Sequence, residues 1–336
     1  MNLIVLKEPD KIWEEFVSKH SYLVFHTSLW GKVLKEGYGC EMKYLVLEDS
    51  DDWLLALPGM LLGNRFFRVF YSLVPYGGFI GQKKFIPEFL ELLEEKAKKE
   101  KINRIKIVDL KIKKKEQLPG FECMESYRHL LELKEKPLDQ IFKDYKPNLK
   151  RAIKKALNSD LLFERIKDRK EIEHFHELYL ESMKRNRALA KYPIKLFYKI
   201  FDLLIPELAD FFFVKYESKP IAGIVVIYSE ESAYYFHGGS STECLHLRPN
   251  DLLFHKAIKV AKEKGKSYFD FLGSDKGFSS LIQFKDKWGT KREELLVFQK
   301  DIGTIRPVLG KIALGFAQTP IGTAIQRKLI TTKNER

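Results

Sequence analysis

Two carboxylates near the C-terminal end of the chain, Asp270 and Asp275, stand where a side chain could accept a proton. They flank the end of an apolar, strand-like run within residues 269–289, FDFLGSDKGFSSLIQFKDKWG. A carboxylate that reaches a reacting group at such a strand end would act as a general base. Asp270 also alternates with Phe269 and Phe271, so a solvent-facing strand position is an equal interpretation of this residue.

The second half of the same stretch has the pattern of a short helix. Leu281, Phe284 and Trp288 recur at helical spacing, which is typical of a packed apolar face. In that interpretation Lys285 is simply solvated. Two glycines before the helix would let the loop approach a bound molecule closely.

His237 is a third titratable candidate, because it stands beside Gly238 and Gly239 at a predicted strand end. It could line a cleft where strands separate, or bond to the backbone. No GxSxG elbow and no Ser, His and Asp set is recognisable. The three cysteines are far apart and form no CxxC pair, which argues against a disulfide framework and a zinc site. We expect neither a metal site nor a catalytic triad.

Composition limits the class of protein. The chain has 336 residues, 45% of them hydrophobic, which is ample for about two globular domains. It carries 59 Lys and Arg against 46 Asp and Glu, a formal net charge of +13, which favours a polyanionic or membrane-surface partner. The N-terminus resembles no secretory signal, and no run of about 18 uncharged apolar residues occurs. We expect a cytoplasmic protein with no membrane span.

The elements that must position these residues occur twice. Each half has three consecutive antiparallel strands, then a helix and a further strand. The second half has strands at 211–216, 221–228 and 233–239, a helix from the N-cap Asn250 to Gly265, and a strand at 268–273. The first half has strands at 43–49, 53–61 and 66–78, a helix from Pro87, and a strand at 103–110.

The spacing of the two sets also matches. Gly78 and Gly239, at the ends of the two third strands, are 161 residues apart, and Ile107 and Phe269, in the two last strands, are 162 apart. This predicts an α+β protein with two copies of one unit, each a twisted, mostly antiparallel sheet flanked by helices. We expect a first lobe at 1–136, a second at 137–302 that carries the candidate site residues 270–285, and a helical tail at 303–336 that packs back on the first lobe.

The order of strands and helices, with several motifs, resembles the FemABX family, the Fem-type aminoacyltransferases with tandem GNAT-like lobes. The motifs are FHTSLWGKVLKEGYG (25–39), SLVPYGG (72–78), NLKRAIKKAL (148–157), YYFHGGSS (234–241) with RPNDLLFHKAIKVAKEKG (248–265), and GFSSLIQFKDKWG (277–289). Together they cover most of residues 20–300.

The resemblance implies a reaction and roles for particular residues. Fem-type enzymes take an amino acid from aminoacyl-tRNA and place it on an amino group of a nucleotide- or lipid-linked peptide. The matching Phe284 and Lys285 are implied to lie beside the acyl ester, where the ring can stack on a base and the ammonium can meet a phosphate or the oxyanion. Positioning and oxyanion stabilisation can carry most of such a reaction.

The resemblance also suggests residues that bind the two substrates. Lys32, Tyr76, Arg185 and Arg187 lie in segments similar to those that handle the acceptor. The helix from Asn148 carries four cations on one face, which suits either tRNA or a solvated surface; they are Lys150, Arg151, Lys154 and Lys155. We expect a monomer that also contacts a membrane surface peripherally.

The acyl donor separates the alternatives. Acetyltransferases of the GNAT type carry a glycine-rich loop whose N–H groups hold the CoA pyrophosphate. Here that place is HLRPNDLL, which has no glycine, and so we expect no CoA and no other cofactor. An N-acyltransferase that uses acyl-CoA or another donor on a polysaccharide or lipid precursor is the alternative. A non-catalytic basic protein that binds RNA or a membrane surface is the second alternative.

Overall fold

The computed structural model describes residues 1–64 and 66–303, which form two compact units. Within the described residues, unit 1 comprises Met1–Ser126 and 294–303, and unit 2 comprises Tyr127–Glu293. The division therefore falls ten residues before the predicted boundary at 136, and residues 294–302, which were predicted in the second lobe, belong with unit 1. Beyond Gly303, the prediction for the tail lies outside the described residues.

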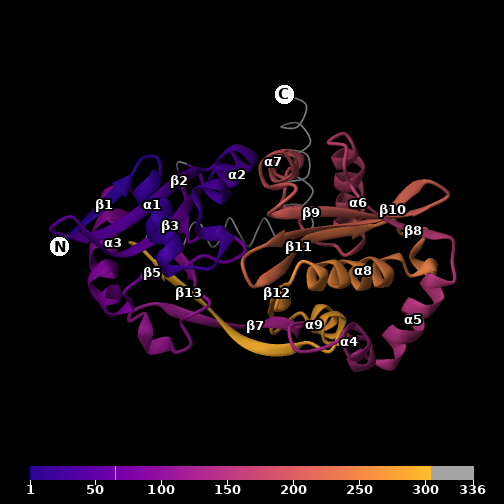
Figure 1. The fold of residues 1–336 in the computed structure, drawn as a ribbon. Helices are drawn as coiled ribbons and strands as arrows, with labels where there is room; N and C mark the ends of the chain where they lie inside the picture. Colours follow the sequence, from indigo (N-terminus) through magenta and orange to yellow (C-terminus); the bar gives the residue numbers. More distant parts are fainter. Residues whose placement is uncertain (65, 304–336) are drawn as a thin grey trace. The chain divides into compact units, whose positions relative to one another are not determined.

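Unit 1 contains one sheet in the strand order β1-β2-β3-β4-β6-β13, with β5 paired to β3 (Figure 1). Its strands are β1 (Asn2–Leu6), β2 (Glu41–Asp49), β3 (Asp52–Gly63), β4 (Arg68–Tyr71), β5 (Ile80–Gly81), β6 (Arg104–Val108), the start of β7 (Glu122–Glu132) and most of β13 (Lys291–Asp301). Its helices are α1 (Lys11–His20), α2 (Ser28–Tyr38) and α3 (Ile86–Lys99), with short 3₁₀ turns at Val24–His26, Lys83–Phe85 and Lys115–Gln117.

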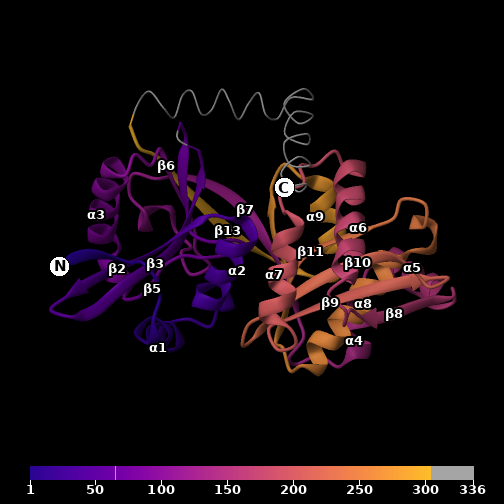
Figure 2. The ribbon, with the colours of Figure 1, turned by 90° about the horizontal axis from the view of Figure 1, so that it is seen from above.

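Helices cover both faces of this sheet (Figure 2). Leu45 and Leu57 pack with Phe89 of α3 in one apolar cluster. Val46 and Ala56, their chain neighbours, pack with α1 in another. Successive strand residues point to opposite faces, so two buried faces require nearly continuous apolar strands.

Unit 2 repeats this plan, with the strand order β7-β12-β11-β10-β9-β8. Its further strands are β8 (Leu161–Arg165), β9 (Ala209–Tyr216), β10 (Lys219–Tyr228), β11 (Ser232–Ser240) and β12 (Tyr268–Asp275). Its helices are α4 (Leu138–Asp144), α5 (Pro147–Leu157), α6 (Glu171–Arg185), α7 (Ile194–Leu204), α8 (Pro249–Glu263) and α9 (Ser279–Asp286), with a 3₁₀ turn at Leu245–Leu247.

The central strand β10 explains why its sequence is apolar throughout. Ala222, Ile224 and Val226 join α5 and α8 in one core cluster. On the other face, Gly223 lies so close to Phe175 of α6 that a Cβ atom would stand 2.9 Å from its ring. Figure 1 shows α6 and α7 on one side of β9, β10 and β11, with α8 on the other.

The predicted fold class is confirmed, because both units contain an antiparallel meander, a helix and a strand parallel to the third strand. In unit 1 these are β2, β3, β4, α3 and β6, and in unit 2 they are β9, β10, β11, α8 and β12. Two details differ. The third strand of unit 1 ends at Tyr71 rather than Gly78, and α8 begins at Pro249, so that Arg248 and not Asn250 is its N-cap. Among the described residues no helix is long and apolar enough to span a membrane.

Candidate active site

A cavity of about 720 Å³ opens in unit 2 where β11 and β12 separate. The two strands pair in parallel only from Ser232 with Tyr268 to Tyr234 with Asp270, although β11 continues to Ser240. Beyond the last pair, side chains fill the gap only in part. The cavity is lined by residues of α6, β11, α8, β12 and α9, among them Arg185, His237, Asn250, Leu272, Phe284 and Lys285.

Of the described residues, Lys285 is the one lysine on this cavity wall, and it is only 3% exposed. Its Nζ donates hydrogen bonds to the carbonyl oxygens of Leu272 at 3.0 Å and Gly273 at 2.9 Å. An ammonium has three N–H donors, so one remains for a molecule in the cavity. Burial lowers the pKa of Lys285 to about 8, so the side chain is still mostly charged at pH 7.

The two carbonyls are held in place by Asp270. Leu272 has φ +62°, a left-handed conformation that costs energy in a residue other than glycine. Its N–H donates to Asp270 Oδ1 at 2.7 Å, which stabilises this conformation within β12, just past the last residue paired with β11. The other oxygen, Oδ2, accepts from Arg128 Nε at 2.6 Å. Arg128, Asp270 and the Leu272 turn therefore form a support for Lys285.

The interpretation of Asp270 as a solvent-facing residue is wrong, since its side chain is fully buried. Burial raises the pKa of Asp270, and the Arg128 guanidinium opposes that shift. A carboxylate committed to a guanidinium and a backbone N–H is poorly suited to remove a proton from a substrate. Its position points to electrostatic support of Lys285. Asp275, the other predicted carboxylate, is exposed at the end of β12 and is not among the residues that line the cavity.

The aromatic residues of the α9 segment divide between core and cavity. Trp288 is fully buried and packs with Tyr145 and Phe254, as the packed-face interpretation predicts. Leu281, in contrast, is 40% exposed. Phe284 is half-buried: its ring meets Phe254 edge-on at 5.4 Å and also lines the cavity.

His237 both bonds to the backbone and lines the cavity, so the two alternatives predicted for it hold together. Its Nδ1 accepts the N–H of Gly238 at 2.9 Å, and its side chain lines the cavity. The imidazole packs edge-on against Tyr179 at 4.6 Å and Tyr192 at 5.2 Å. Burial lowers the pKa of His237 to about 4, so the ring is neutral at pH 7.

Arg185 lines the cavity as part of a polar cluster. Its guanidinium donates to the Ser240 carbonyl at 2.7 Å and to Ser182 Oγ at 2.9 Å. Asn250, within α8, donates through Nδ2 to Ser240 Oγ at 2.9 Å. The cluster joins α6, β11 and α8 at the cavity wall. Arg187, predicted beside Arg185, is exposed in the following loop and is not among the lining residues.

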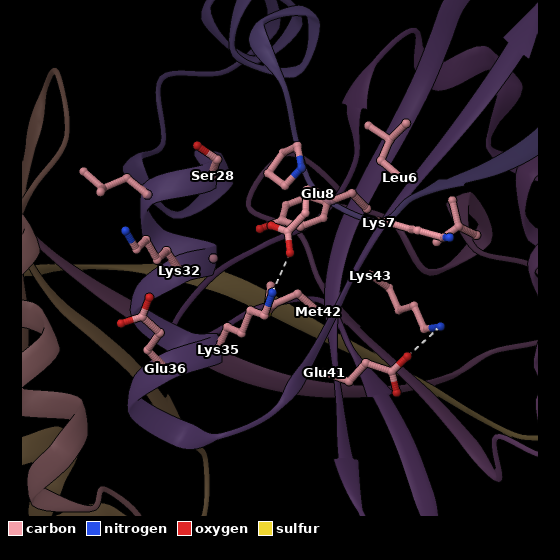
Figure 3. A pocket seen from close by; sticks show the side chains of 15 residues that line it. Leu6, Lys7, Glu8, Ser28, Lys32, Lys35, Glu36, Glu41, Met42 and Lys43 are labelled. Atoms are coloured by element: carbon pink, nitrogen blue, oxygen red, sulfur yellow. Dashed lines mark hydrogen bonds and ion pairs between the residues drawn. The ribbon is translucent and has the colours of Figure 1, made fainter.

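The two predicted substrate residues of unit 1 have different surroundings. Lys32 is exposed on α2 and lines a separate pocket of about 580 Å³ (Figure 3). There, Lys35 pairs with Glu8 at 2.6 Å and Lys43 with Glu41 at 2.8 Å. Tyr76 is 1% exposed in the core, so the prediction that its side chain contacts a substrate conflicts with its burial.

The four predicted cations of α5 do not form one uniform face. Lys150 donates to the Lys143 carbonyl at 2.9 Å. Arg151, Lys154 and Lys155 are exposed, and only Arg151 and Lys155 of the four line a pocket. Within residues 1–64 and 66–303, no cluster of His, Cys, Asp or Glu could hold a metal ion.

Sequence reasoning did not identify Arg128, Ser182 or Asn250 as site residues. Arg128 lies 142 residues from its partner Asp270, and no local pattern connects them. Asn250 was interpreted as a helix cap. The one available signal was its place in the motif RPNDLL beside the predicted helix start.

Comparison with known proteins agrees with this architecture. An acetyltransferase (GNAT) domain family matches residues 143–285, which lie within unit 2 and contain the whole cavity wall. The crystal structure of FemX is similar with a TM-score of 0.69 and 18% identity, covering 92% of this chain and 99% of that one. A tandem GNAT protein from the clavulanic acid pathway has a TM-score of 0.61 and 10% identity, covering 90% and 99%.

Among curated proteins, the lipid II:glycine glycyltransferase of Staphylococcus aureus is 30% identical over 80 residues. That match covers 22% of this chain and 19% of the relative, so it spans about a fifth of the curated protein. The chain has the tandem GNAT fold of Fem-type proteins, and the resemblance predicted from its sequence is confirmed. The predicted enzyme class, an acyltransferase, agrees with the matched domain and with this relative.

Proposed function

We propose that this protein is a Fem-type aminoacyltransferase, which moves an amino acid from aminoacyl-tRNA to an amino group of a peptidoglycan-precursor-like acceptor. The observation that carries the proposal is Lys285, a buried ammonium with one uncommitted N–H on the wall of an aromatic-lined cavity. The curated relative, named as a lipid II:glycine glycyltransferase, supports the same class of reaction.

In the proposed reaction the acceptor amine attacks the ester carbon of the donor. The C–N bond forms first and places negative charge on the carbonyl oxygen of the ester, which the third N–H of Lys285 would stabilise. The C–O bond to the ribose then breaks, and the proton lost by the amine ends on the ribose oxygen, which leaves as a hydroxyl. Because burial lowers the pKa of Lys285 only to about 8, that donor is charged at neutral pH.

Phe284 and the polar cluster would orient the donor. The exposed face of the Phe284 ring offers a surface on which a base can stack. His237 is neutral and its Nδ1 is occupied, so its remaining ring nitrogen can donate a hydrogen bond to the acyl group. Lys32, which lines the unit 1 pocket and has no side-chain partner among residues 1–64 and 66–303, is the proposed contact for an acceptor phosphate.

The proposal includes a setting. The donor is aminoacyl-tRNA, the acceptor is a nucleotide- or lipid-linked peptide, and the enzyme works as a cytoplasmic monomer that contacts the membrane surface where a lipid-linked acceptor lies. The net charge of +13 favours such polyanionic partners.

A second candidate function is N-acylation with an acyl-CoA donor. It is favoured by the acetyltransferase (GNAT) domain match over residues 143–285. The absence of glycine from the loop before α8 speaks against it, because Pro249 also lacks an N–H to offer a pyrophosphate.

The deciding experiment supplies radiolabelled aminoacyl-tRNA, charged with each amino acid in turn, and a nucleotide-linked pentapeptide. We expect one aminoacyl group to appear on the peptide in amide linkage, with loss of the product in Lys285→Met. Transfer from acetyl-CoA with none from any aminoacyl-tRNA would favour the second candidate. RNA binding with no transfer from either donor would favour a non-catalytic binding protein.

A further inference from the structure

A second pocket of unit 2, of about 360 Å³, has a strongly basic wall. We call it the basic pocket. Its charged lining consists of Arg151 and Lys155 from α5, Arg248 and Asp251 at the start of α8, and Lys287 just after α9. Four cations therefore face one carboxylate.

The local fold explains why α5 directs cations to this pocket. Leu149, Ile153 and Ala156 bury one side of the helix in the core cluster shared with α8. Arg151 and Lys155 are four residues apart on the remaining surface and are therefore neighbours. The third unpaired cation, Arg248, precedes α8 at φ +62°, a conformation that few residues other than glycine adopt.

Most of this positive charge is not neutralised by the protein. Lys287 pairs with Asp251 at 2.6 Å. The side chains of Arg151, Lys155 and Arg248 make no ion pair or hydrogen bond with any residue of 1–64 or 66–303. In the unit 1 pocket, by contrast, two of the four lining lysines, Lys35 and Lys43, have carboxylate partners (Figure 3). Unpaired cations gathered in a concavity repel one another and favour a bound anion.

The basic pocket adjoins the candidate active site. Asn250 lines the active-site cavity, whereas Arg248 and Asp251 on either side of it line the basic pocket. The Lys287 ammonium also lies 4.5 Å from the centre of the Phe284 ring, which belongs to the cavity wall. An anion held in the basic pocket would therefore be a near neighbour of a group stacked on Phe284.

We propose that the basic pocket binds a backbone phosphate of the RNA donor, close to its acylated 3′ end. This inference rests on the proposed function. It adds Arg248 and Lys287 to the residues proposed to bind RNA. It also divides the four cations of α5 into two that bind the phosphate, Arg151 and Lys155, and two that do not. Guanidinium groups suit phosphate because they can donate two parallel hydrogen bonds. Separate side chains from three segments suit single phosphodiesters along a strand, and Pro249 leaves a gap in any N–H cradle for a pyrophosphate.

The test uses a fluorescein-labelled single-stranded 12-nucleotide RNA that ends in CCA, with anisotropy measured at several salt concentrations. Arg151→Gln and Arg248→Gln should each weaken binding several-fold at low salt and lower the slope of log K against log salt by about 0.7, the share of one phosphate contact. Lys154→Gln is the matched control. It removes the same charge from the same helix, but Lys154 does not line the basic pocket, so slope and affinity should stay near those of the unaltered protein.

The control also provides the contrary outcome. If Lys154→Gln lowers the slope as much as Arg151→Gln, the helix acts as a diffuse basic surface and the basic pocket is not a site. The proposal would also be overturned if the two pocket substitutions weakened the binding of CoA but not that of the RNA. All three positions are exposed, so circular dichroism and melting temperature should be unchanged.

Failure of this inference can be distinguished from failure of the proposed function. If Arg248→Gln and Arg151→Gln bind the RNA normally while the unaltered protein transfers an aminoacyl group, the pocket assignment is wrong and the function stands. If the two variants lose RNA affinity but no aminoacyl group is ever transferred, the phosphate site stands and the function is wrong.

Discussion

Each unit has one pair of parallel strands at the corresponding place, β4 with β6 in unit 1 and β11 with β12 in unit 2. The junction where this pairing ends is closed in unit 1 and open in unit 2. In unit 1, hydrogen bonds continue past the last residues of β4: Ser72 N–H donates to the Lys106 carbonyl at 2.9 Å, and Gly77 N–H to the Val108 carbonyl at 3.2 Å. Asp109 then accepts Phe79 N–H at 2.8 Å. In unit 2 the pairing stops at Tyr234 and Asp270, and a cavity begins.

The difference shows how a duplicated fold can keep one junction as scaffold and use the other as a site. In both units a buried carboxylate where the parallel strand pairing ends, Asp109 after β6 and Asp270 within β12, accepts backbone N–H groups. Asp109 accepts the N–H groups of Phe79 and Lys111, and these bonds hold the two chain segments together after β6. Asp270 uses one to hold the Leu272 turn, whose carbonyl and that of Gly273 receive Lys285.

The largest effect that would test this contrast is expected for Lys285→Met. The substitution keeps the apolar stem and removes the donor, so turnover in the aminoacyl-transfer assay should fall roughly 10²- to 10³-fold, as for loss of one preorganised oxyanion donor. Lys83→Met is the control, because Lys83 lies 3.6 Å from Asp109 at the sealed junction. Equal losses in both variants would mean that the open junction has no special role.

Asp270→Asn should weaken the support beneath Lys285. It leaves the Arg128 guanidinium without its close partner, and breaking a buried pair costs about 3 to 5 kcal/mol of unfolding free energy. The Asp270 charge also raises the pKa of Lys285, so its loss should move the basic limb of the pH profile to lower pH. Chemical denaturation and a pH series measure the two effects. A proton-accepting role would instead abolish turnover at every pH.

Phe284→Leu should separate stacking from packing. If the ring stacks on the donor, RNA affinity should fall by about 1 to 3 kcal/mol. Since the side chain is only half-buried, melting temperature should change little. Phe89→Leu, in the unit 1 core, should lower the melting temperature and leave RNA affinity unchanged. A Phe284 variant that loses stability but binds RNA normally would show that the ring is structural.

The smallest effect concerns pH. Lys285 must be charged to stabilise an oxyanion, and its pKa is lowered to about 8, so turnover should decline as pH rises through about 8. In the unfolded chain an ordinary lysine keeps its proton to about pH 10.4. Between these values the unfolded state binds more protons, so the free energy of unfolding should rise with pH. Lys285→Met should lack both trends, and a profile that is flat to pH 10 would contradict the assignment.

The sequence was sufficient to predict the meanders because both faces of each sheet are buried, which leaves long apolar strands between turns. It failed for β7 and β13. Residues 291–294 at the start of β13 are charged and exposed, and β7 buries Arg128 and His129, so neither strand has a recognisable apolar pattern.

The candidate site was predictable only in part. Phe284 and Lys285 followed from a family resemblance, and both line the cavity. The hydrogen-bond partners of Lys285 are backbone carbonyls, and no residue type in the sequence indicates such a contact. The contact of Arg128 with Asp270 depends on the pairing of β7 with β12, which no local pattern predicts. Composition could not separate Arg151 and Lys155 from Lys154, because helix register decides which of them face the basic pocket.

The surroundings of His237 give the cavity a spectroscopic label of its own. Its imidazole lies edge-on to the Tyr179 ring, with the ring centres 4.6 Å apart and an angle of 83° between the planes. Because burial lowers its pKa to about 4, its proton resonances should stay constant from pH 6 to 8. Ring-current shifts should make the His237 signals distinct. A nuclear magnetic resonance titration that follows them could therefore detect any molecule entering the cavity, including one that is never turned over.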